Sequence, residues 1–103
     1  MYVVYNTYDN LVKIKVSDFY RGVKRPFRFE GATSVQLELP SIPQTISSGI
    51  DWSIGDGVVE MDLGAAGLTP GTYPARLVVF DPLHPNGQSL VHEDVHRFQL
   101  RVV

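Results

Sequence analysis

The sequence predicts an all-β protein with two antiparallel sheets packed face to face, and three observations lead to this prediction. Val, Ile and Thr together number 24 residues against 13 for Ala plus Leu, and β-branched side chains favour strands over helices. Several segments alternate apolar and polar residues with a period of two. Clusters of Gly, Pro, Asn and Asp, which are typical of turns, separate these segments.

The alternating segments define the expected strands. A first, weaker candidate is Tyr2 to Tyr5. Four segments alternate clearly and are expected to be half-buried strands: Val12–Val16, Val35–Leu39, Val59–Leu63 and Phe98–Val102. The segment Tyr73–Phe80 is apolar on both faces near its end, which favours a central strand. Weaker candidates are Phe27–Glu30 and Ile50–Ile54.

The turn clusters complete the pattern. They lie at Asn6–Asn10, 31–33, Pro40–Pro43, Gly55–Gly57, Pro70–Gly71 and Pro82–Gly87. No segment keeps a helical apolar repeat for ten residues, and Gly64–Leu68 has room for one helical turn. Seven to eight short strands in about 100 residues indicate a β-sandwich, with a small barrel as the alternative.

Length and composition limit the function classes. We expect one domain over residues 1–103, because 103 residues with 44% hydrophobic content suffice for one core. The net charge is −2 and there is no Cys, which disfavours nucleic acid as a partner and excludes thiolate chemistry. The start shows no secretion signal and no apolar run approaches the ~18 residues of a membrane span, so we expect synthesis in the cytosol and no membrane partner.

One motif narrows the architecture. The segment Leu68–Tyr73 carries Pro70 and Gly71 directly before the apolar strand. It resembles the tyrosine corner of immunoglobulin-like sandwiches, in which a Tyr hydroxyl bonds back to upstream backbone. The resemblance implies an immunoglobulin-like fold and a structural role for Tyr73, with the Pro-Gly pair as the turn.

The string His92-Glu-Asp-Val-His96 matches the H-E-x-x-H pattern of zinc hydrolases. That pattern needs a helix, whereas this segment leads directly into the strand expected at Phe98–Val102. On a strand the two His would lie roughly 13 Å apart, too far for one zinc ion. We therefore predict no metal site, no cofactor and no enzymatic activity. A zinc hydrolase that uses His92, Glu93 and His96 is the third and least favoured hypothesis.

Other residues are candidates for binding. Arg21, Lys24 and Arg25 lie among aromatic residues and are expected in a solvated loop that could contact an acidic surface. His84 lies in a proline-bounded loop of the kind that carries binding residues in sandwiches. Trp52 is either a core residue or a stacking platform for a sugar.

A resemblance to known proteins suggests the function. The segment from Gly55 to Val103 contains a glycine turn, the Pro-Gly-x-Tyr motif and a final alternating strand. It is similar to small immunoglobulin-like domains of tailed-phage virion proteins, including tail and baseplate adaptors. The resemblance implies a non-enzymatic structural protein of a phage or prophage, located in the virion.

The first ten residues are expected to form an interface arm. Tyr2, Tyr5 and Tyr8 lie within the first eight residues, and Tyr is favoured at protein interfaces. We expect other virion proteins as partners and self-association into a homo-oligomer. The alternative hypothesis is a carbohydrate- or ligand-binding β-sandwich module with Trp52 and exposed tyrosines as the stacking surface.

Overall fold

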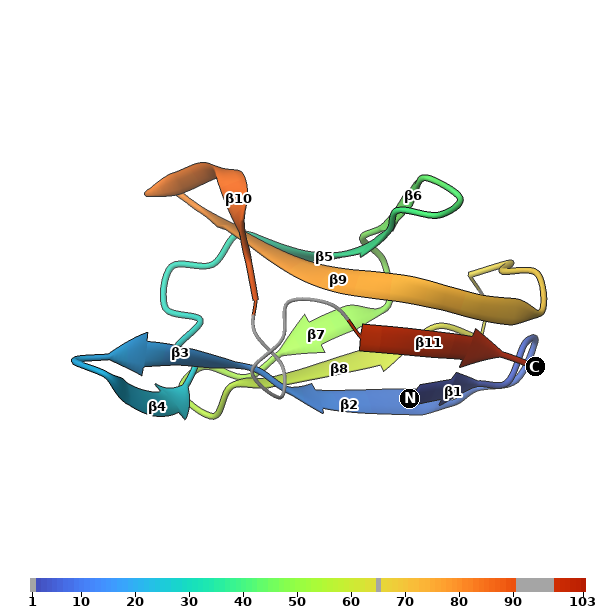
Figure 1. Cartoon of the computed structure of the whole chain (residues 1–103), viewed down its shortest axis with the longest axis horizontal. Helices are drawn as coiled ribbons and strands as arrows, with labels where there is room; N and C mark the ends of the chain where they lie inside the picture. The colour runs from blue at the N-terminus through green and yellow to red at the C-terminus, as the bar shows by residue number, and fades with distance from the viewer. Residues whose placement is uncertain (1, 65, 91–97) are drawn as a thin grey trace.

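The protein is all-β. The computed structural model describes residues 2–64, 66–90 and 98–103, and its described part contains strands and turns but no helix (Figure 1). Within these described residues, eleven strands form sheets of six, three and two strands. The number exceeds the seven or eight expected because short strands of three or four residues carry too little alternation to be recognised in sequence.

The six-stranded sheet is organised around one long strand, β9 (Gly71–Asp81). One edge of β9 pairs with β5 (Ser34–Leu39), which in turn pairs with β6 (Gln44–Ile46). The other edge pairs first with β11 (Phe98–Val102) and, further along, with β10 (His84–Ser89). Strand β9 is therefore central, as the apolar residues on both of its faces near its end predict.

The N-terminal strand departs from the antiparallel expectation. Strand β1 (Tyr2–Val4) lies parallel to β11, with Tyr2 opposite Leu100 and Val4 opposite Val102. Parallel pairing is possible here because the chain leaves β1 for the other sheet and returns to β11 only at its end. Residues 2–4 are consequently part of the sheet, and Val4 is fully buried.

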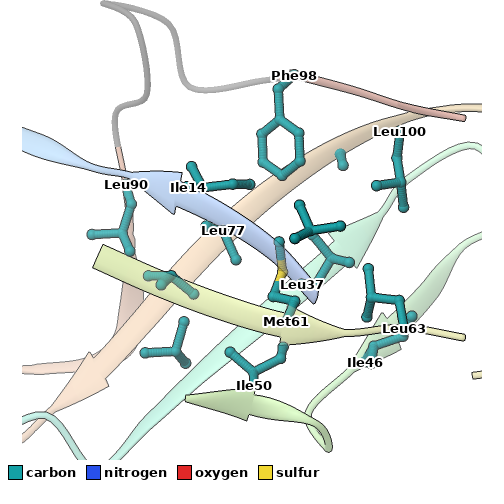
Figure 2. Close-up of a cluster of buried hydrophobic side chains, with 14 of the residues drawn as sticks. Ile14, Leu37, Ile46, Ile50, Met61, Leu63, Leu77, Leu90, Phe98 and Leu100 are labelled. Atoms are coloured by element: carbon teal, nitrogen blue, oxygen red, sulfur yellow. The ribbon is translucent and has the colours of Figure 1, made fainter. Parts of the chain in front are cut away.

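The three-stranded sheet has the order β2-β8-β7, formed by β2 (Leu11–Lys15), β8 (Val58–Asp62) and β7 (Ile50–Trp52). Alternate residues of both sheets point into one shared core (Figure 2). Ile14 and Met61 come from the small sheet, and Leu37, Leu77 and Leu100 from the large one. All five are at most 1% exposed.

The two-stranded sheet is a hairpin of β3 (Ser17–Tyr20) and β4 (Val23–Pro26). It continues from β2 and extends to one end of the molecule (Figure 1). Arg21 and Gly22 form the two-residue turn, with φ of 52° and 78°. Positive φ at both positions is the type I′ geometry that matches the twist of a tight hairpin.

Three local expectations were wrong. Phe27–Glu30 is not a strand, although Phe27 and Phe29 are buried and Arg28 is exposed as its alternation predicted. Arg21, Lys24 and Arg25 belong to the β3–β4 hairpin and not to a loop. The turn expected over Pro82–Gly87 is limited to Pro82 and Leu83, because β10 begins at His84 and absorbs Gly87 in an irregularity of pairing.

Tyr73 holds the chain where it bends into β9. Its hydroxyl donates a hydrogen bond to the carbonyl oxygen of Thr69 at 2.6 Å, and its ring is buried. Gly71 lies close to this ring: a Cβ at position 71 would lie 3.7 Å from Cζ and from the hydroxyl oxygen of Tyr73. The turn expected at Pro70-Gly71 is only a bend at Pro70, because Gly71 already belongs to β9, and the Tyr73 side chain holds the chain at the start of this strand.

We predict that Leu37→Ala lowers the free energy of unfolding by about 2–5 kcal/mol, because it removes a fully buried side chain from the centre of the core. Leu83→Ala is the matched control, since Leu83 is 86% exposed and its loss should change stability by less than about 0.5 kcal/mol. Guanidinium denaturation of both variants measures the difference. Equal effects would contradict the placement of the core.

Tyr73→Phe removes the hydroxyl bond to Thr69 and leaves the ring in place. We expect a loss of about 1 kcal/mol, the usual net contribution of such a bond, measured as a lower denaturation midpoint with an unchanged slope. The control is Tyr8→Phe, since Tyr8 is 72% exposed. An unchanged midpoint for Tyr73→Phe would show that the bond is not stabilising.

Candidate functional site

The segment Tyr5–Asn10, which we call the tyrosine loop, joins β1 to β2, and the side chain of Asn10 bonds to its backbone. The side-chain amide nitrogen Nδ2 of Asn10 donates hydrogen bonds to the carbonyl oxygens of Tyr5 at 3.0 Å and Tyr8 at 2.9 Å. Its side-chain oxygen accepts from the Tyr5 amide at 3.4 Å. One amide group therefore satisfies several backbone groups of a turn and fixes its path.

A close approach of Gly64 anchors the same loop to the rest of the protein. The carbonyl oxygen of Gly64 accepts a hydrogen bond from the Thr7 amide at 2.9 Å. A Cβ at position 64 would overlap the carbonyl oxygen of Tyr8, so only glycine allows the loop to lie this close. Thr7 itself has a φ of 70°, an uncommon value for a residue with a branched side chain.

The three N-terminal tyrosines differ in their surroundings. Tyr2 is half-buried, and its ring meets the ring of Phe98 edge to face with centroids 5.7 Å apart. Tyr5 and Tyr8 are 54% and 72% exposed. The expected arm over residues 1–10 is therefore divided into a strand that belongs to the sheet and a fixed loop that displays two tyrosines. Val3, two residues before Tyr5 in the sequence, is also exposed.

The basic residues Arg21, Lys24 and Arg25 lie on the β3–β4 hairpin, at the opposite end of the view from the tyrosine loop (Figure 1). Arg25 forms a two-pronged ion pair with Asp18 on the facing strand, at 2.8 Å and 3.2 Å. Such paired bonds fix the guanidinium plane as well as its charge. Arg21 and Lys24 are exposed.

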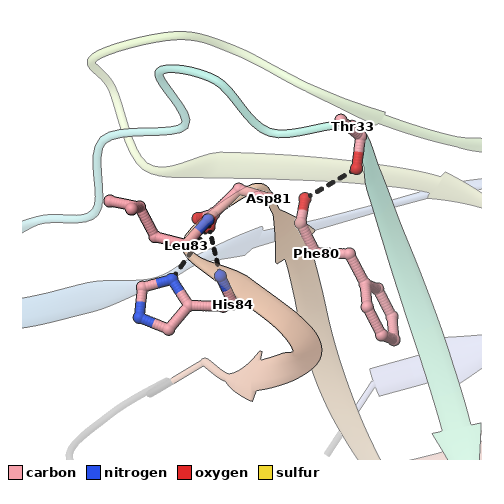
Figure 3. A network of polar contacts seen from close by, with 5 residues as sticks. All are labelled: Thr33, Phe80, Asp81, Leu83 and His84. Carbon is pink, nitrogen blue, oxygen red and sulfur yellow. Dashed lines mark hydrogen bonds and ion pairs between the residues drawn. The ribbon is translucent and has the colours of Figure 1, made fainter.

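His84 lies at the start of β10 and contacts Asp81 at the end of β9 (Figure 3). One carboxylate oxygen of Asp81 accepts from the amides of Leu83 and His84, at 2.9 Å and 2.8 Å. The same oxygen lies 2.9 Å from Nδ1 of His84. The side chain of His84 is 45% exposed, so it is accessible while Asp81 closes the turn.

The surroundings of Asp81 lower its pKa below the ordinary value of 3.8. Partial burial alone would raise the pKa, since the side chain is only 17% exposed. The hydrogen bond and the charge of His84, together with the two backbone amides, outweigh this effect and stabilise the ionised form. The carboxylate is therefore a structural acceptor that orders the β9–β10 turn.

Trp52 ends β7 and is half-buried at the edge of the core. Its ring lies 6.5 Å from that of Phe29 and is tilted by 36°. A cavity of about 170 Å³ lies beside it, lined also by Asp51, Ser53 and Glu60. The ring thus contributes to core packing, and the role of Trp52 as a sugar platform stays a prediction.

The zinc-hydrolase hypothesis concerns residues that the structure does not describe. His92, Glu93 and His96 lie outside the described residues. Within residues 2–64, 66–90 and 98–103, no group of three His, Asp or Glu side chains is placed to hold a metal ion. The same ranges contain no helix that is long and apolar enough to cross a membrane.

The sequence prediction missed three residues that shape these surfaces. Asn10 and Gly64 position the tyrosine loop, and Asp18 orders Arg25. Asn10 had a local signal, because Asn side chains often bond to nearby backbone in turns. Asp18 and Gly64 had none, because their partners are set by strand pairing and by contact between distant segments.

Comparison with known proteins identifies no family. No family model and no curated relative match the sequence. One solved structure, the endo-beta-1,4-mannanase from Thermotoga petrophila, has a similar part with a TM-score of 0.46 and 13% sequence identity. The similarity covers 97% of this chain but only 17% of the mannanase, and at this level it gives no argument about the fold or activity of the chain.

We predict that the free energy of unfolding falls in acid, partly because Asp81 becomes protonated there. Its pKa is lowered in the folded protein, so its contribution is present above about pH 4 and is lost as the pH falls through the lowered pKa. Asp81→Asn keeps a hydrogen-bond acceptor but cannot titrate. Denaturation midpoints between about pH 5 and pH 3 should therefore fall less in Asp81→Asn than in the unchanged protein, and parallel curves would contradict the assignment.

Proposed function

We propose that this protein is a non-enzymatic structural module that acts through protein–protein contacts, and that the tyrosine loop is a contact surface. The observation that carries the proposal is the fixed display of Tyr5 and Tyr8. Both side chains are exposed, while Asn10 and Gly64 hold the backbone beneath them. A pre-ordered aromatic surface loses little entropy on binding, and Tyr is enriched among residues that dominate interfaces.

We further propose that the fold is an immunoglobulin-like sandwich. The strand order supports this, because β11-β9-β5-β6 and β2-β8-β7 correspond to the G-F-C-C′ and B-E-D sheets of variable-type domains. The bond from Tyr73 back to Thr69, at the start of β9, is a second argument. The β3–β4 hairpin would then be an insertion between two strands of the domain.

The proposed location is the virion of a tailed phage or prophage. It is based on the similarity of Gly55–Val103 to small virion domains, in which a glycine turn and a Pro-Gly-x-Tyr motif precede the final strand. Partners would be neighbouring tail proteins and further copies of this chain. Mass spectrometry of phage particles from the encoding strain should detect the chain, and its consistent absence from purified particles would contradict this location.

The contact surface can be tested by association. We expect the protein to self-associate in sedimentation velocity, and the double variant Tyr5→Ser and Tyr8→Ser to weaken association at least tenfold, because interface tyrosines commonly contribute about 1–2 kcal/mol each. Leu83→Ser is the control, since it removes a large apolar side chain that is even more exposed, at the β9–β10 turn. If the protein stays monomeric at high concentration, or the control weakens association equally, the tyrosine loop is not a self-association surface.

A further inference from the structure

Strand β10 contains a segment that is exposed and irregularly paired. β10 pairs with β9 at His84 and again from Gln88 onward, and the register shifts between these two residues. Within the part of the chain that the structure describes, residues 85–87 have no partner residue in this register. Asn86 is exposed and Gly87 is half-buried. A backbone segment outside a regular ladder is held less firmly, so it leaves its average conformation more easily.

Packing requires glycine at position 87. Gly87 adopts a φ of 89°, a region that residues with a side chain rarely occupy. A Cβ at this position would lie 2.5 Å from Cγ1 of Val78 and 3.0 Å from Cε1 of Phe80, both on the facing strand. The fold of β10 thus places a glycine directly after an exposed asparagine.

The Asn86-Gly87 pair carries two groups that can react with each other. A bond between the backbone nitrogen of Gly87 and Cγ of Asn86 closes a five-membered ring. Intramolecular attack of this kind benefits from a high effective concentration of the nucleophile, and asparagine is among the thermolabile residues. A side chain on the residue that supplies the nitrogen would hinder its approach, and glycine has none. The glycine that packing requires therefore leaves Asn86 open to attack by its own backbone.

We infer that Asn86 is a site of spontaneous deamidation in the folded protein. The Gly87 nitrogen attacks Cγ of Asn86, the Cγ–Nδ2 bond breaks, and ammonia leaves with the proton of the Gly87 amide. Water then opens the resulting succinimide ring at either of its carbonyl carbons. The products are aspartate and isoaspartate, and the reaction transfers no electrons. The inference does not depend on the tyrosine loop.

The two products differ in their effect on the fold. Both add a negative charge to a chain whose net charge is −2. Isoaspartate also places an additional methylene group in the main chain before Gly87, which is closely packed on β9. Beyond this point Gln88 faces Val79, and the Leu90 amide donates to the Leu77 carbonyl oxygen at 2.9 Å. A longer main chain cannot keep all these contacts, so isoaspartate should weaken β9–β10 pairing, whereas aspartate should not.

The other two asparagines are internal controls. Asn6 precedes Thr7, and Asn10 precedes Leu11, so both following residues carry side chains that hinder ring closure. The side-chain nitrogen of Asn10 is also held by two hydrogen bonds to the backbone of the tyrosine loop. Asn86 combines exposure, irregular pairing and a following glycine.

The test is ageing of the folded full-length chain at mildly alkaline pH, followed by peptide mapping with mass spectrometry. We expect Asn86 to be converted at least about tenfold faster than Asn6 or Asn10, because only its ring closure is unhindered. The converted peptides carry OH in place of NH2 and separate into aspartate and isoaspartate forms. The rate should rise with pH, since removal of the Gly87 amide proton assists the attack. Comparable rates at the three asparagines would overturn the inference.

The same experiment in urea separates the fold from the sequence. We expect the rate at Asn86 in the folded protein to stay within about tenfold of the rate in the unfolded chain, because residues 85–87 lie outside the regular ladder. A folded rate that falls further than this would show that β10 protects the site, and it would overturn the inference.

Hydrogen exchange tests the consequence for the fold. The purified isoaspartate form should exchange the amides of residues 88–90 faster than the fresh protein. Asn86→Asp, which adds the charge without the methylene group, should not, and equal exchange in the two would contradict the effect on pairing. Asn86→Gln, aged in parallel, is the matched control, since its side chain would have to close a larger ring. It also accounts for Asp56-Gly57, which can form a succinimide without a net change in mass.

Discussion

The pairing of β9 on both edges is the constraint on which the rest of the structure depends. Its 11 residues pair with β5 on one side and with β10 and β11 on the other. This fixes which residues face inward, because a shift of one residue would turn Leu77 and Val79 out of the core. The Tyr73 hydroxyl bond sets where the strand begins, and Asp81 orders the turn where it ends.

Two ordered segments project where the chain leaves this framework. The tyrosine loop carries the chain from β1 in one sheet to β2 in the other, and the β3–β4 hairpin extends beyond the end of β2. Both segments are ordered by local polar bonds rather than by deep burial, through Asn10 in the loop and Asp18 in the hairpin. Polar anchoring leaves their outward side chains accessible, which suits surfaces that meet other proteins.

The sequence was informative where alternation was long. The segments at β2, β5, β8 and β11 were located to within a residue at each end, since one buried face requires a period of two. Short strands are harder to locate from the sequence, because three or four residues cannot establish a period of two. For this reason the sequence predicts a loop at Arg21, Lys24 and Arg25, whereas the type I′ turn at Arg21 and Gly22 depends on φ values that only the pairing of β3 with β4 imposes.

The sequence by itself determined the all-β class, the central place of β9 and the burial of alternate apolar residues, because burial and periodicity are local properties of the chain. Tertiary structure alone decided that Tyr2 packs against Phe98 while Tyr5 and Tyr8 stay exposed. It also gathered Lys15, Lys24 and Arg25 around one cleft. Such groupings join residues far apart in the chain, and their positions follow from how the sheets pack and not from any pattern between neighbours.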